Sequence, residues 1–197
     1  MTLNRKSTLP EVAVTVGAHL ARRGIRAVLT GGACVAIHTG TCVSKDADYV
    51  IQSNIRQSTL EEALGELGFS RRGDRYVHAD VPFFVEFPPG PLSIGDDLEI
   101  VPAELTVGGV VALGLSATDS CRDRLAAFYH WDDRQALELA VDIARRQPVD
   151  LDLVRLWSAA EGNTDKCEEF LRKVAQGHHK PGRQGRGRSL VSRKKPV

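Results

Sequence analysis

The sequence lacks both a secretory signal and an apolar run long enough to span a membrane. Residues 1–10 contain no apolar stretch of the kind that forms the centre of a signal peptide. No later segment approaches the roughly 20 apolar residues that a transmembrane helix requires. From these absences we expect a cytoplasmic protein without a membrane partner.

Paired cysteines and internal repeats are also missing. The sequence has no Cys-x-x-Cys pair and no Cys/His cluster that would hold zinc, because its four cysteines are widely spread: Cys34, Cys42, Cys121 and Cys167. We therefore expect reduced thiols and neither a disulfide framework nor a zinc site.

The charge is balanced overall but unevenly distributed. Lys and Arg contribute seven charges after residue 176, where there are no acids, so the remainder of a chain of net charge +1 carries −6. Because residues 177–197 are basic and rich in glycine, we expect a disordered tail there. Such a tail either contacts nucleic acid or another polyanion, or is simply solvated.

The hydrophobic pattern of the first 115 residues indicates both helices and strands. We expect helices at 9–23, at 33–37 and at 58–67, the last with a capping hydroxyl at Ser58 or Thr59. Strands are expected at 26–30, 45–52, 76–79, 81–87, 98–105 and 107–113, with a turn at 72–74. From Thr118 to Val174 the pattern is helical. We therefore expect an α/β core at 1–115, a helical region at 116–176 and the tail at 177–197.

Two acids of the predicted strand 45–52 form the strongest candidate site. Alternate residues of a strand project to the same side, so Asp46 and Asp48 would share one face, about 7 Å apart along the strand. Hard oxygen ligands of this kind hold Mg²⁺. A third acid usually completes such a site, and Glu86 is expected to supply it because it interrupts an apolar strand; Asp80 is the nearby alternative.

A glycine pair follows the first predicted strand. Gly31 and Gly32 stand between that strand and an apolar helix, where backbone N–H groups and the positive end of the helix could receive phosphates. Each feature alone also has an ordinary explanation: the acids as solvated surface groups and the glycines as a turn.

In their order and spacing, these motifs resemble the polymerase β-type nucleotidyltransferase superfamily. The resemblance rests on residues 29–32 (Leu-Thr-Gly-Gly), 44–50 (Ser-Lys-Asp-Ala-Asp-Tyr-Val) and 85–87 (Val-Glu-Phe). Within the superfamily, the sequence resembles the small prokaryotic members, including those found in toxin–antitoxin modules. The implied fold is α+β, a nucleotidyltransferase fold with a small mixed sheet flanked by helices, followed by a C-terminal helical region.

The resemblance implies roles for seven residues. Asp46, Asp48 and Glu86 would bind Mg²⁺ or Mn²⁺, and Glu86 would activate the acceptor hydroxyl or share the second ion. Four others would contact the triphosphate of an NTP: Gly31, Gly32, Ser44 and Lys45.

The implied function is transfer of a nucleoside monophosphate from an NTP such as ATP. The acceptor would be RNA, a protein or a small molecule, and a cognate toxin or antitoxin is an expected partner. The alternative is a catalytically silent relative that keeps the fold and acts as a partner-binding or antitoxin-like module.

Residues 123–134 allow two interpretations. In the first, which we expect, they form a core helix followed by a new N-cap at Asp132, with three residues inward: Leu125, Phe128 and Tyr129. In the second, Asp123, Arg124 or Arg134 reaches the cleft and Tyr129 or Trp131 stacks on a base.

Overall fold

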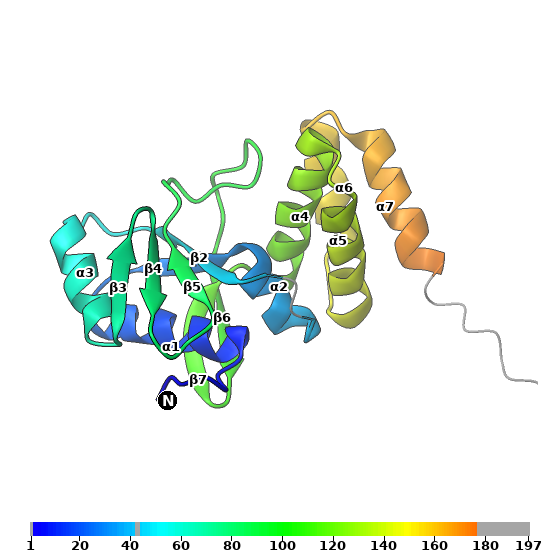
Figure 1. Cartoon of the computed structure of the whole chain (residues 1–197). Coiled ribbons are helices and arrows are strands. Elements are labelled where there is room, and N and C mark those ends of the chain that lie inside the picture. The colour runs from blue at the N-terminus through cyan, green and yellow to red at the C-terminus, as the bar shows by residue number, and fades with distance from the viewer. Residues whose placement is uncertain (1, 42–43, 177–197) are drawn as a thin grey trace, which may run out of the picture.

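A seven-stranded mixed sheet forms the first part of the molecule (Figure 1). The computed structural model describes residues 2–41 and 44–176. The strands lie in the order β3-β4-β5-β2-β1-β7-β6. Their bounds are β1 (Ala27–Thr30), β2 (Asp46–Ile51), β3 (Phe69–Arg72), β4 (Arg75–His78), β5 (Phe84–Glu86), β6 (Ala103–Val107) and β7 (Val110–Gly114).

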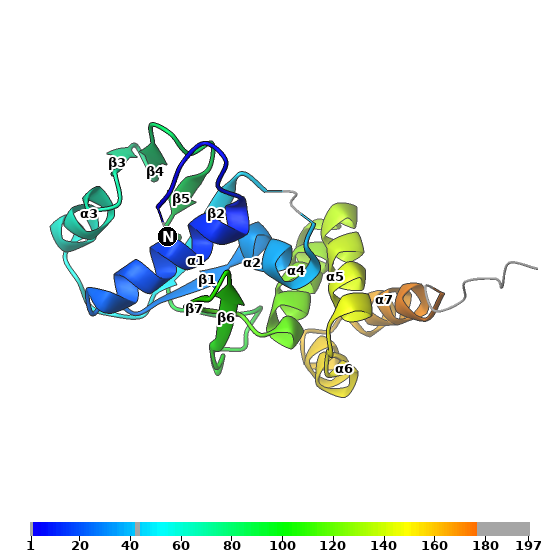
Figure 2. The same ribbon diagram turned by 90° about the horizontal axis from the view of Figure 1, so that it is seen from below.

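Three helices pack on this sheet: α1 (Leu9–Arg22), α2 (Gly31–Thr39) and α3 (Gln57–Gly65). Helix α1 lies along the sheet and contacts β1 and β7 (Figure 2). It begins with a capping box, in which Thr8 and Glu11 each accept a hydrogen bond from the other's backbone N–H. The helix predicted at 9–23 is therefore confirmed.

The pairing of β2 with its two neighbours determines where its acids lie. Strand β2 is antiparallel to β1, which sets Asp48 opposite Thr30, the residue before Gly31. It is parallel to β5, which sets Asp48 opposite Glu86. Because β2 lies inside the sheet, its alternate residues Ala47 and Tyr49 are fully buried on the other side. The acids of β2 thus face away from that buried side.

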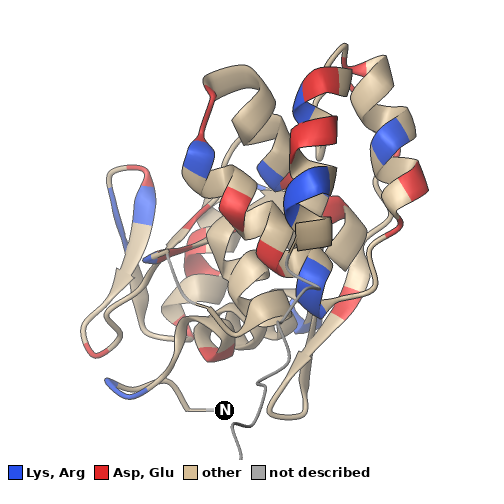
Figure 3. Ribbon diagram, turned by 90° about the vertical axis from the view of Figure 1, so that its right-hand side faces the viewer, with Lys and Arg blue, Asp and Glu red and all other residues tan. Residues whose placement is uncertain are grey.

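Four helices form the second part of the molecule: α4 (Ala117–Trp131), α5 (Arg134–Arg146), α6 (Leu151–Ala160) and α7 (Thr164–Gln176). They pack on one another, and α2 contacts both α4 and α5 (Figure 1). Acidic and basic residues are interspersed along these helices (Figure 3). One cluster of buried apolar residues includes Tyr49 from the sheet and Phe128 from the helices. The predicted α+β architecture is confirmed.

Several local predictions were wrong. Helix α3 begins at Gln57 after Arg56, and no side chain caps it, so neither Ser58 nor Thr59 supplies the expected capping hydroxyl. Asp132 ends α4 in a left-handed conformation (φ 51°), and Asp133 is the N-cap of α5. Strand β3 was not predicted, because three of its four residues are exposed and show no apolar alternation.

Other predictions concern single features of the chain. Cys34, Cys121 and Cys167 are free and buried. In residues 2–41 and 44–176, no helix has both the length and the apolar character needed to cross a bilayer. The basic tail predicted at 177–197 and Cys42 lie outside the described residues.

Candidate functional site

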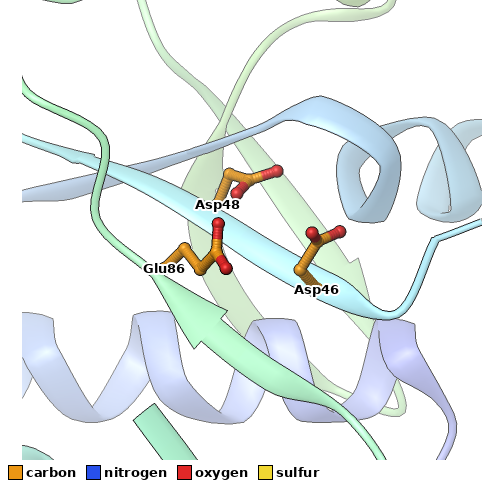
Figure 4. A group of neighbouring side chains, drawn as sticks. All are labelled: Asp46, Asp48 and Glu86. Carbon is orange, nitrogen blue, oxygen red and sulfur yellow. The ribbon is translucent and has the colours of Figure 1, made fainter. Parts of the chain in front are cut away.

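Three carboxylates converge at the junction of β2 and β5. Asp46 and Asp48 project from β2, and Glu86 projects from the end of β5 on the same side of the sheet (Figure 4). One carboxylate oxygen of each lies within 4.8 Å of the others, and all three side chains are half-buried. The alternative third acid, Asp80, is exposed and forms an ion pair with Arg5. The structure therefore brings Glu86, and not Asp80, to the pair on β2.

The glycine pair lies directly against these acids. Gly31 is the first residue of α2 and has a φ of +63°, a conformation that other residues seldom adopt. A Cβ atom at Gly31 would overlap Oδ2 of Asp48, and one at Gly32 would lie 2.5 Å from Cβ of Ser44. Glycine at both positions thus lets the start of α2 approach the carboxylates closely. The first N–H groups of a helix have no partner within the helix, so this approach brings backbone donors of α2 next to the acids.

A cavity of about 250 Å³ opens beside this junction. On one side it is lined by the start of α2 and by β2; on the other it is lined by the two helices that follow the sheet. The lining residues are Gly31, Gly32, Ser44, Asp46, Asp48, Arg124, Asp133, Gln135, Ala136 and Leu139. Of the four residues expected at the triphosphate, Lys45 is the exception: it is exposed and does not line the cavity.

The electrostatics of the junction favour a bound cation. Burial, followed by the negative charges of Asp46 and Glu86, raises the pKa of Asp48 from its ordinary value of 3.8 to about 7. The Oγ atom of Ser44 donates a hydrogen bond to Asp46. A divalent ion would relieve the mutual repulsion of the three acids, and carboxylate oxygens are the ligands that Mg²⁺ and Mn²⁺ prefer. The residues present therefore fit such an ion.

In helix α4, part of each interpretation of residues 123–134 holds: the expected residues are buried in the core, and one charged residue reaches the cavity. Leu125, Phe128 and Tyr129 are buried, as in the first. Tyr129 stacks on the ring of Trp157 with centroids 5.5 Å apart, so it is not free to stack on a base. Arg124, however, lines the cavity, as in the second interpretation.

Sequence reasoning missed the wall that α5 supplies. The cavity is lined here by the N-cap Asp133 and by three residues of the first turns of α5: Gln135, Ala136 and Leu139. No spacing rule connects them with residues 31–48, since the contact arises only because α5 packs on α2. Asp133 caps the helix by accepting a hydrogen bond from the N–H of Ala136 at 3.0 Å. The cap was expected one residue earlier, at Asp132, and no sequence pattern pointed to this wall.

The comparisons with known proteins give the fold a name. An antigenic nucleotidyltransferase-like protein from Paracoccidioides brasiliensis is similar over 88% of this chain and 90% of its own, with a TM-score of 0.54 and 16% identity. Two structures of ANT(2'')-Ia were also found. Its complex with adenylyl-2''-tobramycin has 14% identity over 85% of this chain and 99% of its own, with a TM-score of 0.49. Its solution structure has 17% identity over 85% and 96%, with a TM-score of 0.45.

No protein-family model and no curated protein matches the sequence. At 16% identity, the likeness to the Paracoccidioides protein concerns the fold alone. The chain has a nucleotidyltransferase fold, as its motifs led us to expect.

Proposed function

We propose that this protein is a metal-dependent nucleotidyltransferase that moves a nucleoside monophosphate from an NTP to an acceptor hydroxyl or phosphate. The observation that supports this most directly is the convergence of Asp46, Asp48 and Glu86 within 4.8 Å. It is strengthened by the position of Gly31, whose close approach to Asp48 brings the start of α2 to the same point. Carboxylates that bind cations and N–H groups that bind phosphate thereby meet at one place.

In this proposal the three acids hold Mg²⁺ or Mn²⁺. When bound, such an ion would neutralise charge on the triphosphate and lower the pKa of the attacking hydroxyl. The acceptor oxygen forms a bond to the α-phosphorus, the bond from that phosphorus to the bridging oxygen breaks, and pyrophosphate leaves. Glu86 accepts the proton of the acceptor hydroxyl or shares the second ion.

The two sides of the junction suit the two substrates. Asp46 and Asp48 line the cavity, whereas Glu86 is not among its lining residues. In an in-line displacement the nucleophile and the leaving group stand on opposite sides of the phosphorus. We therefore assign the cavity, with Gly31 and Gly32, to the NTP, and the side of Glu86 to the acceptor.

In this proposal, two parts of the chain contribute to the site. Residues 1–115 supply the acids and the glycine pair, and residues 116–176 supply the second wall of the cavity. The acceptor is an RNA, a protein or a small molecule. A protein encoded beside this one, as in a toxin–antitoxin pair, is the first protein acceptor or partner to test.

Isothermal titration tests the site. We expect each NTP to bind the wild type only with Mg²⁺ or Mn²⁺, and the Asp46→Ala/Asp48→Ala variant to lose this binding. Asp80→Ala removes an exposed acid of the same charge and should bind as the wild type does. Release of pyrophosphate with a candidate acceptor then tests transfer. Absence of metal-dependent binding in the wild type would contradict the proposal and support the catalytically silent module.

A further inference from the structure

Arg124 is the one basic residue that lines the cavity within the part of the chain that the structure describes. We propose that its guanidinium binds the β- and γ-phosphates of the NTP and that Asp123 is a positioning residue that holds it in place. The inference rests on the proposed function and adds to it a recognition element on helix α4, outside the sheet.

The geometry at α4 leaves part of the guanidinium available. Nε and Nη2 of Arg124 donate hydrogen bonds to Oδ2 of Asp123, at 3.1 Å and 2.6 Å. Among residues 2–41 and 44–176, none accepts a hydrogen bond from Nη1 of Arg124. The side chain is 22% exposed, so it is shielded but still open to the cavity that it lines. A planar guanidinium held at one edge presents its other N–H groups in a fixed direction, which suits phosphate oxygens.

The charges around the cavity favour a basic group at this position. Its lining includes three acids, Asp46, Asp48 and Asp133, and a triphosphate would bring about four more negative charges into the same space. Divalent ions at the carboxylates would offset part of this charge. Lys45, the lysine nearest to the site in sequence, is exposed and outside the lining. Arg124 therefore supplies the positive charge that the cavity otherwise lacks.

A purely structural role does not explain the pair. Asp123 and Arg124 are adjacent in sequence on one helix turn, so their contact joins no two elements. A partly exposed ion pair of this kind stabilises a fold by about 1 kcal/mol or less. The packing of α4 depends instead on its buried neighbours, Leu125 and Phe128. Loss of Arg124 should accordingly affect ligand binding much more than folding.

The test compares Arg124→Ala with a matched control, Arg155→Ala. Arg155 is on α6 and forms an ion pair with Asp152 at the surface. Titrations with NTP, NMP and inorganic tripolyphosphate are carried out on the full chain with Mg²⁺. We expect Arg124→Ala to weaken NTP and tripolyphosphate binding about 10- to 100-fold, the range expected for hydrogen bonds to a charged partner, and NMP binding less than about 3-fold.

Two further variants separate binding from positioning. Arg124→Lys keeps the positive charge but lacks the planar set of N–H donors of a guanidinium, so its NTP affinity should lie between those of Arg124→Ala and the wild type. Asp123→Asn removes the negative charge and weakens the hold on Arg124, so it should weaken NTP binding by a few fold, again with NMP binding nearly unchanged. Thermal unfolding should differ little between the wild type and all four variants.

Each remaining outcome identifies which idea fails. Equal NTP affinity in Arg124→Ala and the wild type would overturn the role of Arg124 and leave the proposed function intact. Equal losses for NTP and NMP would also overturn it, because they would indicate general damage to the cavity. If the wild type binds neither NTP nor tripolyphosphate with Mg²⁺, the proposed function and this inference fall together.

Discussion

Replacing Asp48 by asparagine is expected to stabilise the metal-free protein at neutral and alkaline pH, although it removes a proposed metal ligand. The pKa of Asp48 is raised to about 7 in the folded protein, mainly by burial and then by Asp46 and Glu86. An acid whose pKa is higher when folded binds its proton more tightly in the folded state. Stability contributed by that proton is present at low pH and is lost as the pH rises through about 4 to 7.

The size of the effect follows from the same numbers. Each pH unit is worth about 1.4 kcal/mol, so a pKa of about 7 in place of 3.8 costs the folded state about 4 kcal/mol above pH 7. Since Asp48 is half-buried and water screens part of this charge, we expect about 2–4 kcal/mol. Asparagine has nearly the same shape and no charge. The gain from Asp48→Asn should therefore be near zero at pH 4 and largest at pH 8.

Urea unfolding in EDTA at pH 4, 5.5, 7 and 8, followed by tryptophan fluorescence, measures this gain. Asp80→Asn, which neutralises an exposed acid, is the control and should change stability by less than about 0.5 kcal/mol at every pH. Adding Mg²⁺ at pH 8 should stabilise the wild type and leave Asp48→Asn unchanged. A variant that is no more stable than the wild type at pH 8, or a gain independent of pH, would refute the reasoning.

Two other predictions follow from the packing. Gly31→Ala should destabilise the protein by about 1–3 kcal/mol in thermal unfolding, because Gly31 has a positive φ and a Cβ there would overlap Asp48. The same substitution should weaken Mg²⁺ binding. The control is Gly65→Ala, where a Cβ meets nothing within 4 Å; it should be neutral or slightly stabilising in the same measurement. Arg122→Ala should cost about 2–3 kcal/mol in urea unfolding, since the buried guanidinium pairs with the partly exposed Asp97 and holds the 87–102 loop to α4. An unchanged midpoint would contradict this.

The elements nearest the site were predictable because their signals are local. A strand that alternates acids with apolar residues can bury only one side, so the shared face of Asp46 and Asp48 follows from the period of two. A glycine pair between a strand and an apolar segment indicated the start of α2, although the helix begins at Gly31 itself and not at residue 33. An isolated acid in an apolar strand, such as Glu86, indicated the third member in the same way.

Other features depend on contacts that no local pattern encodes. The start of α3 has an unexpected boundary because Arg56 precedes the helix without a capping side chain, so the hydroxyls of Ser58 and Thr59 misled the prediction. Strand β3 forms because it pairs with β4, which provides the hydrogen bonds that its exposed side chains do not signal. For β3 the neighbouring strand, and not the segment itself, decided the outcome.

The sequence by itself determined which residues could form the site: two acids two residues apart on one strand, a third acid on another, and a glycine pair at the start of a helix. Only the tertiary structure decided that these groups meet. The parallel pairing of β2 with β5 sets Asp48 opposite Glu86, and the packing of α2 on α4 and α5 brings Arg124 and Gln135 to the same cavity. The alternation of side chains along a strand and the conformational preference of glycine depend only on residues close together in the chain. The cavity is formed by segments about 90 residues apart, which only the packing of the common core brings together.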